Sequence, residues 1–110
     1  MTLIMLVDDI ISEFKESPRN KVFVPIAVLC ESASEELGKK VSAEKLAKII
    51  SDYVAGNLSE KNEAIYDGAV AVCGEVARRC FGDDPDADID YEVSWIENDD
   101  NTFSAEIRPS

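Results

Sequence analysis

The sequence contains no histidine. Histidine is the usual base that activates a serine or cysteine nucleophile, so its absence excludes the Ser-His-Asp and Cys-His arrangements. It also removes the commonest side-chain ligand of zinc and other transition metals. The chain has no glycine-rich phosphate-binding loop and no GxSxG motif either. We therefore expect a protein that is not an enzyme.

Long apolar runs are also missing. No stretch approaches the ~18 consecutive apolar residues that indicate a transmembrane helix, so we expect no contact with a membrane. The apolar residues 3–7 are followed at once by Asp8 and Asp9, and no basic residue precedes them. Because a secretory signal needs a basic start and a longer apolar run, we expect a cytoplasmic protein.

Cysteine is scarce, with only Cys30, Cys73 and Cys80 in the chain. An odd number of cysteines without an export signal indicates reduced thiols. Cys73 and Cys80 are two turns apart on a predicted helix, a rise of about 10 Å, which is too far for a disulfide. We interpret all three as small, buried apolar side chains.

Basic residues are nearly absent from the last quarter of the chain. Residues 83–110 hold ten acidic residues and a single base, Arg108, whereas residues 1–82 hold 13 acidic and 10 basic residues. Most of the formal net charge of −12 therefore belongs to the C-terminal segment. Such a field repels nucleic-acid phosphates and anionic lipids and attracts a basic protein surface or a divalent cation. We expect no direct binding to nucleic acid.

Apolar residues at helical spacing predict four helices. The first covers residues 2–16, the second runs from Pro25 to Gly38, the third from Ser42 to Gly56, and the fourth covers residues 60–81. Ser42 is a typical N-cap, and Gly38 and Gly56 are typical helix ends. The apolar stripe of the third helix consists of Leu46, Ile49, Ile50, Tyr53 and Val54.

The period of the pattern changes to two near the C-terminus. Tyr91, Val93 and Trp95 alternate with polar residues, and so do Phe103, Ala105 and Ile107 after the turn-forming residues 98–101. This predicts a β-hairpin with strands at about 88–97 and 102–108. Because an isolated hairpin is marginally stable, it must pack on the helices or gain a third strand. Residues 21–24 or a partner molecule would supply that strand.

Together these elements predict a single α+β domain of residues 1–110. Its four-helix body covers about residues 1–82, and an acidic C-terminal antiparallel β-hairpin at about 86–108 packs on the helices. The fourth helix contains Gly68 and Gly74, and each glycine costs a helix about 1 kcal/mol relative to alanine. They indicate that another backbone comes close, either within the domain or in a structural homodimer.

One short motif suggests a metal ion. Asp86, Asp88, Asp90 and Glu97 occupy the first, third, fifth and twelfth places of a segment that resembles an EF-hand calcium loop. The sixth place of that loop requires glycine, and here it is Tyr91. The alternation of a β-strand explains the same residues without a metal. Calcium is the one cofactor that the sequence suggests, and no other is expected.

The function that the sequence favours most is a non-catalytic protein–protein interaction module that binds a basic partner, as an inhibitor or a nucleic-acid mimic. The predicted contact residues are Asp86, Asp88, Asp90, Glu92, Asp99 and Asp100, with Trp95 or Tyr91 as the aromatic anchor if it is exposed. Both aromatic residues share the apolar side of a strand, so core packing is the alternative for them. A calcium-binding module and a structural homodimer are the alternative functions.

Overall fold

The computed structural model describes residues 2–82 and 89–110, and within them it has four helices and a three-stranded sheet. The α+β prediction of four helices followed by a hairpin packed on them is confirmed. In chain order the elements are α1 (Leu3–Glu16), β1 (Val22–Val24), α2 (Ile26–Leu37), α3 (Ala43–Val54), α4 (Glu60–Phe81), β2 (Tyr91–Glu97) and β3 (Phe103–Pro109).

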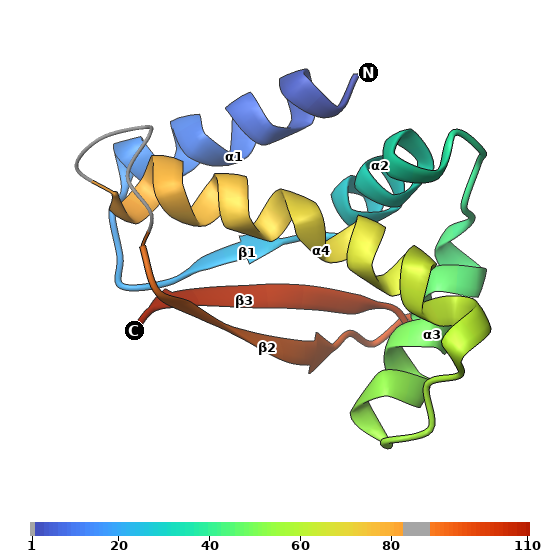
Figure 1. The fold of residues 1–110 in the computed structure, drawn as a ribbon. Coiled ribbons are helices and arrows are strands. Elements are labelled where there is room, and N and C mark those ends of the chain that lie inside the picture. The colour runs from blue at the N-terminus through green and yellow to red at the C-terminus, as the bar shows by residue number, and fades with distance from the viewer. Residues whose placement is uncertain (1, 83–88) are drawn as a thin grey trace.

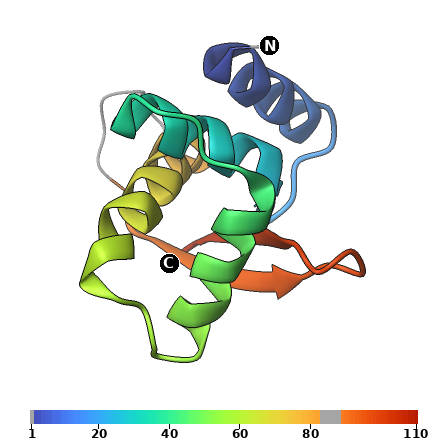
Figure 2. The ribbon, with the colours of Figure 1, turned by 90° about the vertical axis from the view of Figure 1, so that its right-hand side faces the viewer.

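The sheet has the strand order β1-β3-β2, and both pairings are antiparallel. Ile107 of β3 lies between Val22 of β1 and Val93 of β2. The last strand of the chain is therefore central, and the third strand comes from the segment 21–24 rather than from a partner. In Figures 1 and 2 the sheet lies below α1, α2 and α4, and α3 stands at one end of it.

The helix ends follow the local chemistry of the sequence. The Ser42 hydroxyl accepts a hydrogen bond from the Lys45 amide and caps α3, as predicted. Gly38 ends α2 in the left-handed conformation, with φ of 67°, which glycine adopts without steric cost. Pro25 stands at the N-cap of α2. These signals set the lengths of the helices that cover the sheet.

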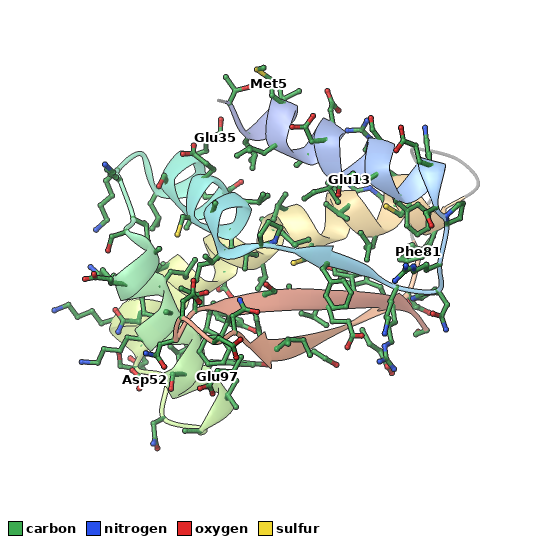
Figure 3. The ribbon with its side chains drawn as sticks, turned by 180° about the vertical axis from the view of Figure 1, so that it is seen from behind. Met5, Glu13, Glu35, Asp52, Phe81 and Glu97 are labelled. Atoms are coloured by element: carbon green, nitrogen blue, oxygen red, sulfur yellow. The ribbon has the colours of Figure 1, made fainter. Side chains whose placement is uncertain are left out.

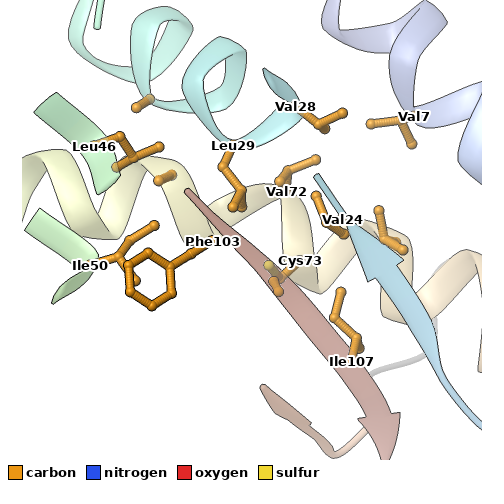
Figure 4. Packing of buried hydrophobic residues seen from close by; sticks show 14 of the residues in the cluster. Val7, Val24, Val28, Leu29, Leu46, Ile50, Val72, Cys73, Phe103 and Ile107 are labelled. Carbon is orange, nitrogen blue, oxygen red and sulfur yellow. The ribbon is translucent and has the colours of Figure 1, made fainter. Parts of the chain in front are cut away.

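The hydrophobic core lies between the helices and one face of the sheet (Figure 4). The cluster includes Val7 of α1, Leu29 of α2, Ile50 of α3, Cys73 of α4 and Ile107 of β3, and each is almost fully buried. One continuous apolar cluster thus holds all four helices on the sheet. The opposite face of the sheet carries no helix among the described residues (Figure 1).

The close approach predicted for the glycines of α4 occurs inside the domain. A Cβ atom on Gly68 would lie 3.3 Å from the Cα atom of Ala33, so α2 and α4 pack backbone to backbone. The buried Ser32 hydroxyl donates a hydrogen bond of 2.6 Å to the Gly68 carbonyl. A Cβ atom on Gly74 would lie 3.3 Å from the Tyr91 hydroxyl oxygen. The feature that suggested a homodimer is thus explained within one chain, and self-association stays a prediction.

None of the helices in the described part of the chain combines the length and the apolar character needed to cross a membrane.

Candidate protein-binding surface on the C-terminal hairpin

The predicted contact residues lie in two groups at opposite ends of β2. Asp86 and Asp88 fall outside the described residues. Asp90 and Glu92 are exposed where β2 begins, and Asp99 and Asp100 are exposed in the turn that follows it. An extended chain rises about 3.3 Å per residue, so roughly 20 Å separates the groups. Between them the outward side of β2 carries Ser94 and Ile96, so the described residues form no continuous row of carboxylates.

One acidic residue of the hairpin is neutralised within the sheet. Glu106 lies on the face away from the helices, yet only 6% of its surface is exposed. Its carboxylate accepts a hydrogen bond of 3.0 Å from the Arg108 guanidinium and lies 3.6 Å from the Lys21 ammonium. The bond from Arg108, more than the charge of Lys21, lowers the pKa of Glu106. Arg108, the single basic residue of the hairpin, is therefore already in an ion pair with Glu106.

Five other acidic residues of the hairpin have no such partner. Among the residues that the structure describes, the ion pairs involve only Asp8 and Glu106 on the acidic side. The five unpaired carboxylates are those of Asp90, Glu92, Glu97, Asp99 and Asp100, and all five residues are exposed. This group is called the hairpin acids below. It carries five negative charges on β2 and its two ends.

Asp100 also orders the turn between β2 and β3. Its carboxylate accepts hydrogen bonds from the amide and from the hydroxyl of Thr102, and both bonds lower its pKa. Asn101 takes the left-handed conformation, with φ of 65°, and asparagine tolerates this better than most residues. The turn therefore fixes the Asp100 carboxylate at the end of the sheet, next to the exposed Asp99.

The turn and α3 enclose a polar hollow of about 530 Å³. Glu44 and Lys48 line it from α3, and Glu97 and Asp100 line it from the hairpin. Figure 3 labels Glu97 at this end of the molecule. Lys48 forms no ion pair with the acids of the hollow, all of which lie in the described part of the chain. Its positive charge only partly offsets the field at this end.

Trp95, the predicted anchor, is half-buried against α4. Its indole N–H donates a hydrogen bond of 3.3 Å to the Tyr66 hydroxyl, and the two rings meet edge to face at 6.0 Å. Tyr66 in turn stacks on Tyr53 of α3 at 4.2 Å. Tyr53 is 46% exposed and Val54 is 58% exposed, so the last residues of the apolar stripe predicted for α3 are not part of the core. Tyr91 is 37% exposed.

Asp90 and Glu97, the two described residues of the EF-hand-like motif, are too far apart to bind one calcium ion. Asp90 precedes β2 and Glu97 ends it, so an extended strand of roughly 20 Å lies between them. Calcium ligands lie about 2.3–2.6 Å from the ion, so these two carboxylates do not share one. Asp86 and Asp88 lie outside the described residues. Within residues 2–82 and 89–110, no three acidic or cysteine side chains are grouped closely enough to hold a metal.

The three thiols are protonated at neutral pH. Burial raises the pKa of Cys73 to about 12 and that of Cys80 to about 11, and it also raises the pKa of Cys30. The thiolate is the nucleophilic form of cysteine, so none of these side chains is activated for catalysis. All three are free, and the prediction that they are buried holds for Cys73 in the core, whereas Cys30 and Cys80 are only partly buried.

A second hollow, which the sequence did not suggest, lies between α1 and β1. It is a groove of about 440 Å³ lined by apolar side chains that include Leu6, Ile10 and Phe14 of α1 and Phe23 of β1. Asp9 and Glu13 stand against Arg19 and Lys21 around it, so its charges balance. The groove therefore does not favour a partner of either charge, whereas the acidic hairpin favours a basic one.

Comparison of the chain with protein-family models, with curated proteins and with solved structures gave no match. The functional argument therefore rests on the geometry and charge of this chain.

Proposed function

We propose that the domain is a non-catalytic protein–protein interaction module whose acidic hairpin binds a basic surface of a partner protein. The observation that carries this proposal is the set of five hairpin acids, all exposed and none in an ion pair within the described residues. Complementary charge speeds encounter and selects the partner more than it adds affinity. An acidic surface whose carboxylates form no ion pairs in the described part of the chain is suited to that role.

The chemistry of the rest of the chain supports a binding role over a catalytic one. Histidine is absent, and the pKa values of all three thiols are raised by burial. In the hollow beside the turn, the hydrogen bonds from Thr102 lower the pKa of Asp100, away from neutrality. Catalytic acids and bases usually sit where burial or neighbouring charges move their pKa toward the working pH.

Two sets of charge variants with the same net charge test the proposal. The first set changes Asp90→Asn, Glu92→Gln, Glu97→Gln and Asp99→Asn together. The control set changes four exposed helical residues, Glu31, Glu35, Glu36 and Glu60, to Gln. Each set changes the formal net charge from −12 to −8. Tagged proteins are crosslinked in a lysate, and captured proteins are quantified by mass spectrometry.

We expect the hairpin set to lose at least tenfold in capture of basic proteins, and the control set to retain it. Raising the salt from about 0.15 M to 0.5 M shortens the screening length, so capture by the native protein should also fall. Equal capture by the two variant sets would contradict the proposal, because the position of the charges would then have no effect.

A further inference from the structure

The backbone of β2 has one side without a partner in the described chain, and the hydrogen bonds at its two ends show which residues face that side. The Asn98 amide donates to the Thr102 carbonyl at 2.8 Å, and the Ser110 amide donates to the Asp90 carbonyl at 3.1 Å. In an antiparallel pair such bonded positions recur at every second residue. Glu92, Ser94 and Ile96 therefore bond to β3.

The alternate residues of β2 direct their backbone groups away from β3. These residues are Tyr91, Val93, Trp95 and Glu97, and they form what is called the free edge below. The strand order β1-β3-β2 leaves β2 outermost in the described part of the sheet. The free edge thus offers four N–H and four C=O groups at the regular spacing that a further strand requires.

Within residues 2–82 and 89–110, the free edge lacks the usual devices that prevent strand addition. Proteins commonly block an edge with proline, lysine, a bulge or a very short strand. β2 contains neither proline nor lysine, and its seven residues pair with β3 in unbroken register from Tyr91 to Glu97. Only the negative charge of the hairpin acids opposes the addition of another strand to the free edge. The hairpin acids would repel a second copy of the chain, whose own edge carries the same charges, and would attract a basic segment.

We propose that the free edge of β2 binds an extended, lysine- or arginine-bearing segment of the partner, which joins the sheet as a fourth strand. This inference rests on the proposed function and specifies how the basic partner binds. Main-chain bonds to the free edge would supply affinity, and the alternating side chains would supply specificity. Side chains on the helix side of the new strand would lie on the same side of the sheet as Trp95 and Tyr66.

A matched pair of peptides tests strand addition on the native protein. The first is a nine-residue peptide in which lysine alternates with valine and threonine. The second has the same sequence but is N-methylated throughout its interior, so that it keeps its charge and cannot join a sheet. Binding is measured by calorimetry, and hydrogen exchange of the protein amides is followed by mass spectrometry or NMR.

We expect the first peptide to slow exchange of the Val93 and Trp95 amides at least tenfold and to bind at least tenfold more tightly than its methylated form. Equal binding of the two peptides would overturn strand addition and leave the proposed function intact, because charge alone would explain it. No binding of either peptide would also overturn the inference, and the lysate variants would then decide the proposed function independently.

A pair of protein variants tests the same point from the other side. Val93→Pro removes an N–H group of the free edge and no bond to β3, whereas Val93→Ala shortens the same side chain and keeps that group. We expect Val93→Pro to bind the lysine peptide at least tenfold more weakly than Val93→Ala. Equal binding by the two variants would overturn the inference. A dimer of the native protein in sedimentation that does not dissociate when the peptide is added would also overturn it. Exchange on the native chain decides the question if Val93→Pro does not fold.

Discussion

The two edges of the sheet share the central strand β3 but differ in length, flanking residues and surroundings. β1 has only three residues, lies between Lys21 and Pro25, and has α1 beside it across the apolar groove. β2 has seven residues in unbroken register and is surrounded by the hairpin acids. A short strand next to proline and lysine is a poor template for pairing, whereas a long regular strand is a good one. The same sheet therefore has one blocked edge and one open edge.

The difference also shows how charge is distributed between the two edges. Lys21, next to β1, and Arg108 of β3 both engage Glu106, so the middle of the exposed sheet face carries no net negative charge. Within the described part of the sheet, the acidic residues without an ion pair are on β2 and at its ends. Of the hairpin acids, Glu92 lies directly opposite Arg108 in the β2–β3 register, and no ion pair joins the two side chains.

The largest effect is expected where both edges depend on the same residue. Ile107 of β3 is fully buried between Val22 and Val93. Ile107→Ala removes buried methyl groups and leaves a cavity, so we expect it to lower the free energy of unfolding by about 3 kcal/mol. Urea denaturation measures this. Ile96→Ala, at a 40% exposed position of β2, is the control and should cost less than about 1 kcal/mol. Equal losses would contradict the central position of β3.

The next effect distinguishes the two sides of β2. Ser94 lies at a position bonded to β3, so Ser94→Pro should leave the Glu106 carbonyl without its donor and lower the free energy of unfolding by about 1–3 kcal/mol. Ser94→Ala keeps the amide and is the control for the exposed side chain. Urea denaturation of both variants measures the difference. A Ser94→Pro variant as stable as Ser94→Ala would show that the bonded and free sides of β2 are assigned the wrong way round.

A smaller effect concerns the aromatic contact that holds β2 to α4. Tyr66→Phe removes the hydroxyl that accepts the hydrogen bond from Trp95, and we expect a loss of about 1 kcal/mol in the free energy of unfolding. Combining Tyr66→Phe with Trp95→Phe in a double-mutant cycle isolates the pair. The loss in the double variant should be smaller than the sum of the two single losses. Strictly additive losses would show that the bond does not contribute to stability.

The smallest effect is the pH dependence of the Glu106 pairs. The pKa of Glu106 is lower in the folded than in the unfolded chain, so its stabilisation is present above its unfolded pKa, about 4.3, and is lost as pH falls through the folded value. The stability difference between the native protein and Glu106→Gln should therefore shrink as pH falls from neutral toward 3. Urea midpoints across that range measure it. A constant difference would mean that the ionised form of Glu106 is not the one favoured by Arg108.

Local signals in the sequence predicted the elements well, whereas contacts between distant segments were not visible. Ser42 and Gly38 mark helix ends through bonds and backbone angles within a few residues, and the alternation around Val93 marks β2 in the same way. Which strand is central depends on the pairing of β1 with the C-terminus, and no local pattern encodes that. The burial of Glu106 depends on Lys21 from the other edge strand. The exposure of Tyr53 and Val54 likewise depends on which segments pack against the end of α3, and the helical period of the sequence does not reveal that.

Trp95 has a practical consequence for work on this molecule. It is the one tryptophan of the chain, its own backbone groups belong to the free edge, and its indole is held by Tyr66. Indole fluorescence responds to the polarity and hydrogen bonding around the ring. The emission of the unlabelled protein is therefore an intrinsic optical sensor of this single location, and a spectral change on adding a ligand would report directly on β2.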